Sequence, residues 1–393
     1  MPRYLEEFYP PTRLLMGAGP SNVNPRVLQA MNAPLLGHLD PEFLRVMDDV
    51  REMLGLVFQT SNAITFPVSG TGSAGMEAVL VNILEPGDTI VVCSNGYFGD
   101  RLQQIASRCG ATVHLVEAPW GYPLDPDAVS IELKKRSKVK AVAMVHAETS
   151  TGVMNPVAEM ADIAHAHDAL LIVDTVTSLG GMDVAVDKWG IDAAHSGTQK
   201  CLGCPPGLAP ITLGPQAEMV LKSRRTPVQS WYLDMTLLAV YWSERRAYHH
   251  TAPISMIYGL REGLRVILEE GLEMRFQRHH RNAVALRAGL EALGLHFFAE
   301  DGTRLPTLTS VRIPDGVNDA TVRSTLLREY NIEISGGLGP VAGKIWRIGL
   351  MGENSIAANV LTLLSALEEI LPREGFEVGR GEGVATAQRA LAE

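Results

Sequence analysis

The stretch KAVAMVHAETSTGVMNPVAEMADIAHAHDALLIVDTV (residues 140–176) decides the fold class. It opens with a continuous apolar run at 140–147, continues with an amphipathic helical pattern at 157–168, and closes with a second apolar run at 169–176. Strands that are apolar at every position are typical of parallel sheets with both faces covered, and a helix between two such strands is typical of the crossover connection. The stretch therefore predicts an α/β protein built on a mostly parallel sheet.

The same alternation extends on both sides, from about residue 60 to about residue 215. Short apolar runs at 63–68, 89–94 and 112–118 predict further strands, and GMEAVLVNIL (75–84) predicts a helix. The C-terminal part has fewer strands. There we expect a long helix over 258–294 with a possible break at Gly271, strands at 308–314 and 344–350, and helices at 322–330 and 356–371.

These patterns divide the chain into four parts. Residues 1–20 include Pro10, Pro11 and Pro20 and predict an extended arm, and residues 21–264 predict the large domain. Residues 265–373 predict a smaller α+β domain with helices on one side of a few strands. Residues 374–393, rich in glycine and then in alanine, predict a surface appendage.

Composition excludes several classes of protein. Of 393 residues, 46% are hydrophobic and 20% are charged, which is the balance of an ordinary globular protein. The formal charge is −10, from 34 basic and 44 acidic residues, and this argues against binding to nucleic acid or to anionic membranes. We find no signal peptide and no apolar segment long enough to span a membrane, so we expect a cytoplasmic protein. Four scattered cysteines, including the pair Cys201 and Cys204, indicate neither a disulfide framework nor a metal site.

The loop at residues 69–73 (SGTGS) follows the first predicted strand and leads into a helix. Its backbone N–H groups and hydroxyls could hold a phosphate at the helix N-terminus. The loop also matches the G-x-G-x-x-G dinucleotide pattern, at Gly70, Gly72 and Gly75. That pattern requires an acidic residue at the end of the second strand, where this chain has CSN (residues 93–95). A dinucleotide, another phosphate and a plain turn all remain open for this loop.

Two charged residues follow farther along the chain. Asp174 ends the run LLIVD, and an aspartate at the end of a buried strand either caps the next turn or meets a cation. Lys200 ends SGTQK, 26 residues later, where a surface lysine is the ordinary reading of a lone lysine. A phosphate loop, a strand-end aspartate and a lysine in this order fit pyridoxal 5′-phosphate (PLP), whose phosphate, pyridine nitrogen and aldehyde need one partner each.

With these features in this order, the chain resembles the class V, fold type I, PLP-dependent aminotransferases of the alanine–glyoxylate / serine–pyruvate group. The resemblance runs from about Leu14 to about Leu371. The order of the motifs carries the resemblance more than any one of them does. They are GAGPSNVNP (17–25), VSGTGSAGMEAVL (68–80), NGYFGDR (95–101), HAETSTGV (146–153), VDTVTSLGG (173–181), SGTQKCLGCPPG (196–207), YHHTAP (248–253), GGLGP (336–340) and WRIGLMG (346–352).

The resemblance assigns roles around the cofactor ring. It implies that Lys200 binds the cofactor aldehyde and moves the substrate proton, and that Asp174 pairs with the pyridine nitrogen. Val176 would pack on one face of the ring. Phe98 would stack on it where relatives often have tryptophan, and Thr149 would bond the pyridine hydroxyl.

It also assigns roles at the phosphate, at the substrate and across a dimer. Arg347 matches the arginine that clamps the substrate carboxylate, a task that suits a bidentate guanidinium. Tyr248 and Thr251 match residues that reach the phosphate of a partner subunit, which implies a homodimer with shared active sites and with the N-terminal arm wrapped on the partner. The residues expected to bind phosphate within one chain are Thr71, Gly72, Ser73 (where some relatives have histidine) and Gln199.

The sequence therefore predicts a transaminase that moves the amino group of alanine or serine to glyoxylate or a similar small 2-oxo acid by a ping-pong mechanism, with no metal. Serine–glyoxylate, 3-hydroxyaspartate or aspartate–glyoxylate, and pyridoxamine–pyruvate enzymes are the alternatives within the family. A cysteine desulfurase is disfavoured because no cysteine follows Cys204. An NAD-dependent oxidoreductase and a scaffold that has lost catalysis are the alternatives from other classes.

Overall fold

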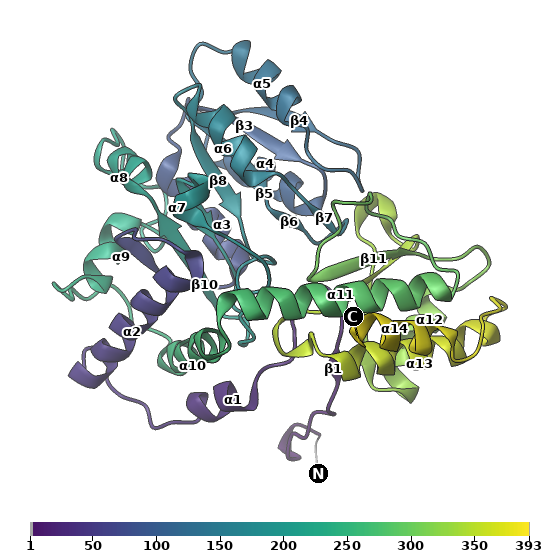
Figure 1. The fold of residues 1–393 in the computed structure, drawn as a ribbon. Coiled ribbons are helices and arrows are strands. Elements are labelled where there is room, and N and C mark those ends of the chain that lie inside the picture. Colours follow the sequence, from purple (N-terminus) through teal and green to yellow (C-terminus); the bar gives the residue numbers. More distant parts are fainter. Residues whose placement is uncertain (1–2, 393) are drawn as a thin grey trace.

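A seven-stranded sheet forms the centre of the larger part of the molecule in the computed structural model, which describes residues 3–392 (Figure 1). The strand order is β2-β10-β9-β8-β5-β3-β4. Strand β10 runs antiparallel to both of its neighbours, and the other neighbouring pairs are parallel. The strands are β2 (Ile64–Ser69), β3 (Thr89–Ser94), β4 (Thr112–Glu117), β5 (Ala141–Val145), β8 (Leu170–Asp174), β9 (Ala193–His195) and β10 (Leu208–Leu213).

The register brings the carboxyl ends of these strands to one edge of the sheet. Asp174 at the end of β8 lies opposite Val145 on one side and His195 on the other. Strands β2 and β9 are both antiparallel to β10, so β2 also ends at this edge, at Ser69. The loops that leave this edge are the usual place for a ligand in an open α/β sheet.

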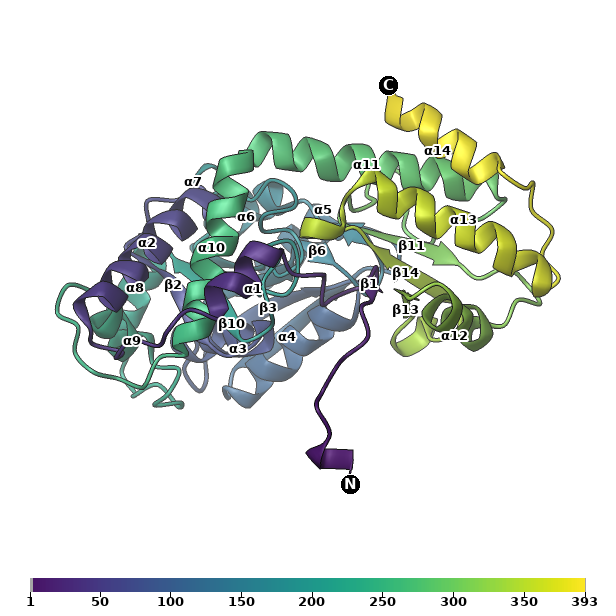
Figure 2. The same ribbon diagram turned by 90° about the horizontal axis from the view of Figure 1, so that it is seen from below.

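Helices cover both faces of the sheet. In Figure 2, α3 and α4 lie side by side on one side of the sheet and α6 lies on the other. Strands β5 and β8 are buried at every position, which explains their continuous apolar sequences. The helices of this part are α1 (Pro25–Met31), α2 (Pro41–Phe58), α3 (Gly72–Ile83), α4 (Tyr97–Arg108), α5 (Pro126–Lys134), α6 (Val157–His165), α7 (Val186–Trp189), α8 (Pro215–Lys222), α9 (Met235–Trp242) and α10 (Ile254–Glu270).

The C-terminal part has its own sheet and its own apolar core. Its antiparallel sheet has the order β11-β14-β13, and Trp346 on β14 is fully buried in the core. Its elements are α11 (Leu272–Ala292), β11 (Leu308–Arg312), α12 (Asp319–Glu329), β13 (Ser335–Gly336), β14 (Ile345–Gly349), α13 (Ala357–Arg373) and α14 (Glu382–Ala392).

Helix α11 joins the two parts, because it runs from the end of α10 along the C-terminal sheet (Figures 1 and 2). The predicted helix over 258–294 is found as α10 and α11, and the break falls at Gly271 as expected. Gly271 has a φ of 84°, a left-handed conformation that glycine adopts without strain.

Two short ladders attach loop segments to this framework. Strand β1 (Leu14–Leu15) pairs in parallel with β12 (Ile332–Glu333), which ties the end of the N-terminal segment to the C-terminal part. Strand β6 (Ala147–Glu148) pairs with β7 (Val153–Met154) directly after β5.

Residues 374–393, for which the sequence predicts a surface appendage, contain α14, which packs on α11 and α13 (Figure 2). Ala387 is fully buried and Leu391 is nearly so, in the same core as α13. Alanine and glycine allow close helix packing, and this accounts for their abundance here. The predicted domain limits themselves stay a prediction.

The predicted fold class is confirmed. The run at 140–147 was predicted as one strand, but β5 ends at Val145 and β6 begins at Ala147. Strand β10, which the sequence analysis did not single out, inserts antiparallel between β2 and β9.

Candidate active site

A cavity opens at the carboxyl edge of the large sheet. Loops that follow β2, β3, β5, β8 and β9 contribute to its wall, as the register requires. Eight of the residues singled out from the sequence line it: Gly72, Ser73, Phe98, Thr149, Asp174, Val176, Gln199 and Lys200. Five further residues line it as well: Met76, Arg101, Val145, Ala147 and Thr177.

The N-terminus of α3 forms one wall of the cavity. Thr71 is the residue that precedes the helix, and its side chain makes no capping hydrogen bond. A Cβ atom on Gly72 would lie 3.1 Å from Val176 Cγ2, so a larger residue would crowd the opposite wall. The first-turn N–H groups of a helix have no helical partner. The free hydroxyl and these N–H groups together make a place for an anion.

Asp174 stands at the end of β8 and is nearly fully buried. Its Oδ1 accepts a hydrogen bond of 2.8 Å from the backbone N–H of Val176. Its Oδ2 lies 3.7 Å from Nε2 of His195, a fully buried residue on β9. Burial lowers the pKa of His195, and the charge of Asp174 opposes this. A buried carboxylate with so few donors is poised for a cationic partner.

Lys200 lies in the turn after β9 and is 8% exposed. Its Nζ donates to the carbonyl oxygen of Ala18, at the end of the N-terminal segment. Burial, and then the positive charge of Arg347, lower the pKa of Lys200 to about 8. The amine therefore has a substantial neutral fraction at a slightly alkaline pH, which a nucleophilic lysine needs.

Glu148 holds the first turn of α4, which carries Phe98. Its Oε2 accepts from the backbone N–H groups of Phe98 (3.1 Å) and Gly99 (3.2 Å), and its Oε1 accepts from the N–H (3.0 Å) and hydroxyl (2.5 Å) of Ser150. Glu148 is fully buried, and burial raises its pKa to about 7. A Cβ on Gly96 would lie 2.5 Å from Glu148 Cδ, so only glycine fits at this approach.

Arg347 comes to the site from β14 of the C-terminal part. Its Nε donates to the carbonyl oxygen of Gly336 (2.8 Å) and its Nη1 to that of Thr149 (3.3 Å). Burial lowers the pKa of Arg347 to about 10, and the charge of Glu148 opposes this. Arg347 is outside the set of residues that line the cavity, although its charge acts on Lys200.

Tyr248 and Thr251 are not brought to this cavity within one chain. They lie on the segment between α9 and α10, where Thr251 is exposed and Tyr248 is 60% exposed. The ring of Tyr248 contacts that of His38, with a centroid separation of 5.2 Å. Their predicted role at a partner's phosphate stays a prediction.

The comparison with known families decides the assignment. Residues 13–354 match the family described as aminotransferase class V, which is most of the chain. The chain belongs to the class V aminotransferases. The predicted family is confirmed, and the chain is an aminotransferase.

Relatives match this aminotransferase over nearly its whole length. A (S)-ureidoglycine–glyoxylate transaminase of Bacillus subtilis is 45% identical over 394 aligned positions, covering 95% of this chain and 94% of the relative. The crystal structure of ureidoglycine–glyoxylate aminotransferase from Bacillus subtilis has a TM-score of 0.97 and covers 99% of this chain and 100% of its own. The crystal structure of an alanine–glyoxylate aminotransferase from Nostoc sp. is 49% identical with a TM-score of 0.92, covering 93% of this chain and 97% of its own.

Class V aminotransferases use PLP, and the cavity of this aminotransferase fits that cofactor. The uncapped N-terminus of α3 suits the phosphate, and Asp174 can face a protonated pyridine nitrogen. The side chain of Gln199 lines the same wall with its Oε1 atom unpartnered, and its amide NH2 group is the one that can donate to a phosphate. Lys200 lines the cavity, so its amine can react with the aldehyde of the cofactor.

Three residues of the site were not predicted from the sequence: Glu148, His195 and Arg101. Glu148 stands inside a quoted motif and His195 directly before one, but only the folded sheet shows that Glu148 binds the backbone of Phe98 and that His195 lies beside Asp174. Arg101 belongs to a quoted motif, and in the structure it lines the cavity beside Ser73. A charged residue one helical turn beyond Phe98 was the available signal for Arg101.

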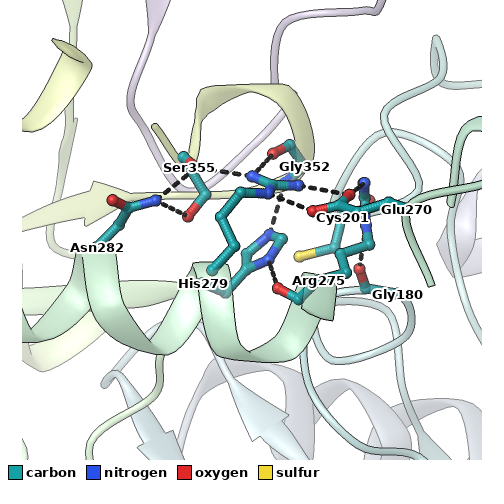
Figure 3. Close-up of polar contacts among 9 residues, drawn as sticks. Gly180, Cys201, Glu270, Arg275, His279, Asn282, Gly352 and Ser355 are labelled. Carbon is teal, nitrogen blue, oxygen red and sulfur yellow. Dashed lines mark hydrogen bonds and ion pairs between the residues drawn. The ribbon is translucent and has the colours of Figure 1, made fainter. Parts of the chain in front are cut away.

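A polar cluster on the first turns of α11 contacts Cys201, the residue that follows Lys200 (Figure 3). Arg275 is 1% exposed. Its Nε donates to the carbonyl oxygen of Gly180 (2.7 Å), its Nη2 to that of Cys201 (2.8 Å), and its Nη1 to Glu270 (2.6 Å). The turn that follows Lys200 is thereby fixed to α11.

Other members of this α11 cluster hold the loop after β14 (Figure 3). Arg278 Nη1 donates to the carbonyl oxygens of Gly352 (3.0 Å) and Ser355 (2.7 Å). His279 Nδ1 donates to the carbonyl oxygen of Arg275 (2.8 Å), and its Nε2 accepts from the N–H of Gly352 (3.0 Å). These partners require a neutral ring, and burial lowers the pKa of His279 to about 3, helped by both arginines. The cluster thus joins the Lys200 turn to the loop that follows the Arg347 strand.

Within residues 3–392 we find no group of side chains that could hold a metal ion, and no helix long and apolar enough to cross a membrane. All four cysteines are free and buried. Burial raises the pKa of Cys201 to about 11 and that of Cys204 to about 12, so both stay protonated thiols and pack as small apolar groups.

Proposed function

We propose that this aminotransferase moves the amino group of a small amino acid, alanine or serine, to glyoxylate or a similar small 2-oxo acid by a ping-pong mechanism. The observation that carries this proposal is the placement of one buried guanidinium, Arg347, whose charge acts on Lys200. An amino acid donor and a 2-oxo acid acceptor share an α-carboxylate beside the reacting carbon. One arginine can therefore bind both in turn. The relatives named above support glyoxylate as the acceptor.

The proposed roles follow from the walls of the cavity. Lys200 would bind the aldehyde and, once released by the donor, would move the proton from the donor's α-carbon to the C4′ carbon of the cofactor. In the acceptor half-reaction it would move a proton in the opposite direction, from C4′ to the α-carbon of the new amino acid. When bound, the cofactor holds the donor's amino group and accepts electron density from that carbon. Asp174 keeps the pyridine nitrogen protonated. Val176 and Phe98 pack against the ring, and Thr149 bonds its hydroxyl.

The phosphate would be held by the N-terminus of α3, with Thr71, Gly72, Ser73 and Gln199 as donors. Tyr248 and Thr251 would complete the phosphate site of a second subunit in a homodimer. Their exposure on the chain leaves them available for this contact.

A second donor is favoured by a specific observation. The relative that is 45% identical over 95% of this chain is described as a (S)-ureidoglycine–glyoxylate transaminase. Ureidoglycine has the same α-amino and α-carboxylate groups as alanine and a longer polar side chain. Both donors would therefore use the same residues for the α-amino and α-carboxylate groups. Only the residues around the donor's side chain would distinguish them.

The test is an absorbance titration of the purified enzyme with one amino acid at a time. Alanine or serine should convert the PLP band to the pyridoxamine phosphate form, and glyoxylate should restore it. A response to ureidoglycine alone would replace our donor with the second candidate. A response to free pyridoxamine with pyruvate, and to no amino acid, would contradict both. A protein that shows no PLP band after addition of PLP would overturn the cofactor.

A further inference from the structure

We propose that Arg101 supplies the positive charge that binds the phosphate of PLP within one chain. The proposal rests on the cofactor of the family and not on the amino donor. A phosphate monoester carries a charge of about −1.5 to −2 at neutral pH. Of the residues that line the cavity, Arg101 and Lys200 are the cationic ones. Lys200 is committed to the aldehyde at the other end of the cofactor, so Arg101 is the cation left for the phosphate.

The guanidinium of Arg101 lies at the N-terminus of α3. Its Nη1 donates a hydrogen bond of 2.8 Å to the hydroxyl of Ser73, in the first turn of that helix. Thr71, the preceding cap residue, keeps its hydroxyl free of any capping bond. Arg101 therefore adds a full charge to a group of neutral donors and a helix dipole. Hydrogen bonds to a charged group are about twice as strong as neutral ones.

The aromatic residues of α4 hold Arg101 in this position. Its guanidinium carbon lies 4.9 Å from the ring centroid of Phe98 and 5.4 Å from that of Tyr97. Arg101 stands three and four residues after these rings on α4, a spacing that places side chains on the same face of a helix. Such cation–π contacts fix a guanidinium without neutralising it. Phe98 also lines the ring end of the cavity, so one helix serves both ends of the cofactor.

The charge of Arg101 is available for a ligand. The contacts of its guanidinium among residues 3–392 are the Ser73 hydroxyl and the two rings, with no carboxylate within ion-pair distance. A neighbouring groove is lined by Arg101, Glu77 and Arg108. Arg108 lies on the same helix, and its Nη1 donates to the carbonyl oxygen of Gln104, away from the cofactor cavity. Arg108 is therefore a matched control.

The experiment compares PLP with pyridoxal, which lacks the phosphate, on the cofactor-free enzyme. We expect Arg101→Gln to raise the Kd for PLP by about 10- to 100-fold and to leave the Kd for pyridoxal within about 2-fold, because one charge-assisted bond is lost. Arg108→Gln should change neither constant. The two Kd values are measured by absorbance or fluorescence titration, so catalysis is not needed for the readout.

Two further measurements keep the test decisive. Inorganic phosphate should slow PLP binding to the wild type and to Arg101→Lys much more than to Arg101→Gln. The Arg101→Lys variant also serves if Arg101→Gln does not fold. Equal weakening of PLP and pyridoxal would show that Arg101 only supports Phe98, and an unchanged Kd for PLP would show that it has no part in cofactor binding. Either result would overturn the proposal without bearing on the amino donor.

Discussion

Two buried polar regions flank Lys200, and they differ in how their hydrogen bonds are used. In the α11 cluster, Arg275, Arg278 and His279 leave no buried side-chain nitrogen without a partner. In the cofactor cavity, the Oε1 of Gln199 is unpartnered and the cap at Thr71 makes no bond. A satisfied buried network stabilises the fold, whereas a buried polar group without a partner costs free energy unless a ligand supplies one. The α11 cluster therefore stabilises the fold, and we call it the holding side of Lys200. The cofactor cavity has polar groups free for a ligand, and we call it the binding side.

The largest effect should come from the binding side. Lys200→Ala should lower turnover by at least about 10³-fold, because both the cofactor's covalent partner and the proton carrier are lost. The thermal midpoint of the cofactor-free variant should not fall, because a costly buried amine is removed. Lys222→Ala, at an exposed lysine on α8, should change neither quantity.

Steady-state transamination and thermal unfolding measure the two effects of Lys200→Ala. Retained turnover would end the assignment of Lys200. A large loss of stability at unchanged turnover would place Lys200 with the α11 cluster and erase the contrast between the two regions.

The holding side should show the opposite behaviour. Arg275→Met should destabilise the protein by about 3–5 kcal/mol, because it leaves Glu270 and two buried carbonyl groups short of a donor. Arg373→Met, which breaks ion pairs on exposed side chains, should cost far less, because exposed ion pairs contribute little to stability. Urea unfolding of the cofactor-free variants gives the difference. Equal midpoints for the two variants would contradict the view that the cluster holds the two parts together.

The sequence predicts these two regions unequally. Asp174 is visible because it ends an apolar run, and Lys200 is visible because it follows the phosphate loop and Asp174 in the order that PLP requires. Residues at the carboxyl ends of parallel strands then converge without further information. The same periodicity predicts five strands of the large sheet, β2, β3, β4, β5 and β8. Strand β9 has only three residues, and the apolar pattern of β10 is interrupted by Pro210 and Thr212. Chemistry at strand ends is therefore readable from local pattern.

The α11 cluster could not be predicted in this way. The segment LEMRFQRHH at the start of α11 looks like an exposed polar helix, yet Arg275 and His279 are almost fully buried. Their partners Gly180, Cys201 and Gly352 lie 73 to 95 residues away, so no local pattern contains them. Arg101 differs, because its spacing from Phe98 was a local signal, but its contact with Ser73 of α3 appears only in the folded chain. The roles of Tyr248 and Thr251 depend on a second chain and stay predictions.

The smallest predicted effect is a pH dependence of PLP capture that arises from Lys200 and not from the α11 cluster. The rate at which the cofactor-free enzyme captures PLP should rise from pH 6 to pH 9 with an inflection near 8, because the unprotonated amine reacts and the pKa of Lys200 is lowered to about 8. Burial disfavours the charged amine, so raising the pH through 8 neutralises Lys200 well below the usual value near 10.5 for lysine. His279, with a pKa of about 3, stays neutral over this range, so the α11 cluster contributes no inflection.

Variants of Arg347 test whether a nearby charge sets the pH of this inflection. Its positive charge lowers the pKa of Lys200, so Arg347→Gln should move the inflection upward, whereas Arg347→Lys should leave it in place. His279→Gln, which replaces a neutral ring, should not move it. Stopped-flow measurement of PLP capture across the pH range distinguishes the variants. If Arg347→Gln left the inflection unchanged while His279→Gln moved it, the electrostatic link to Lys200 would run through the holding region, and the division between the two sides of Lys200 would fail.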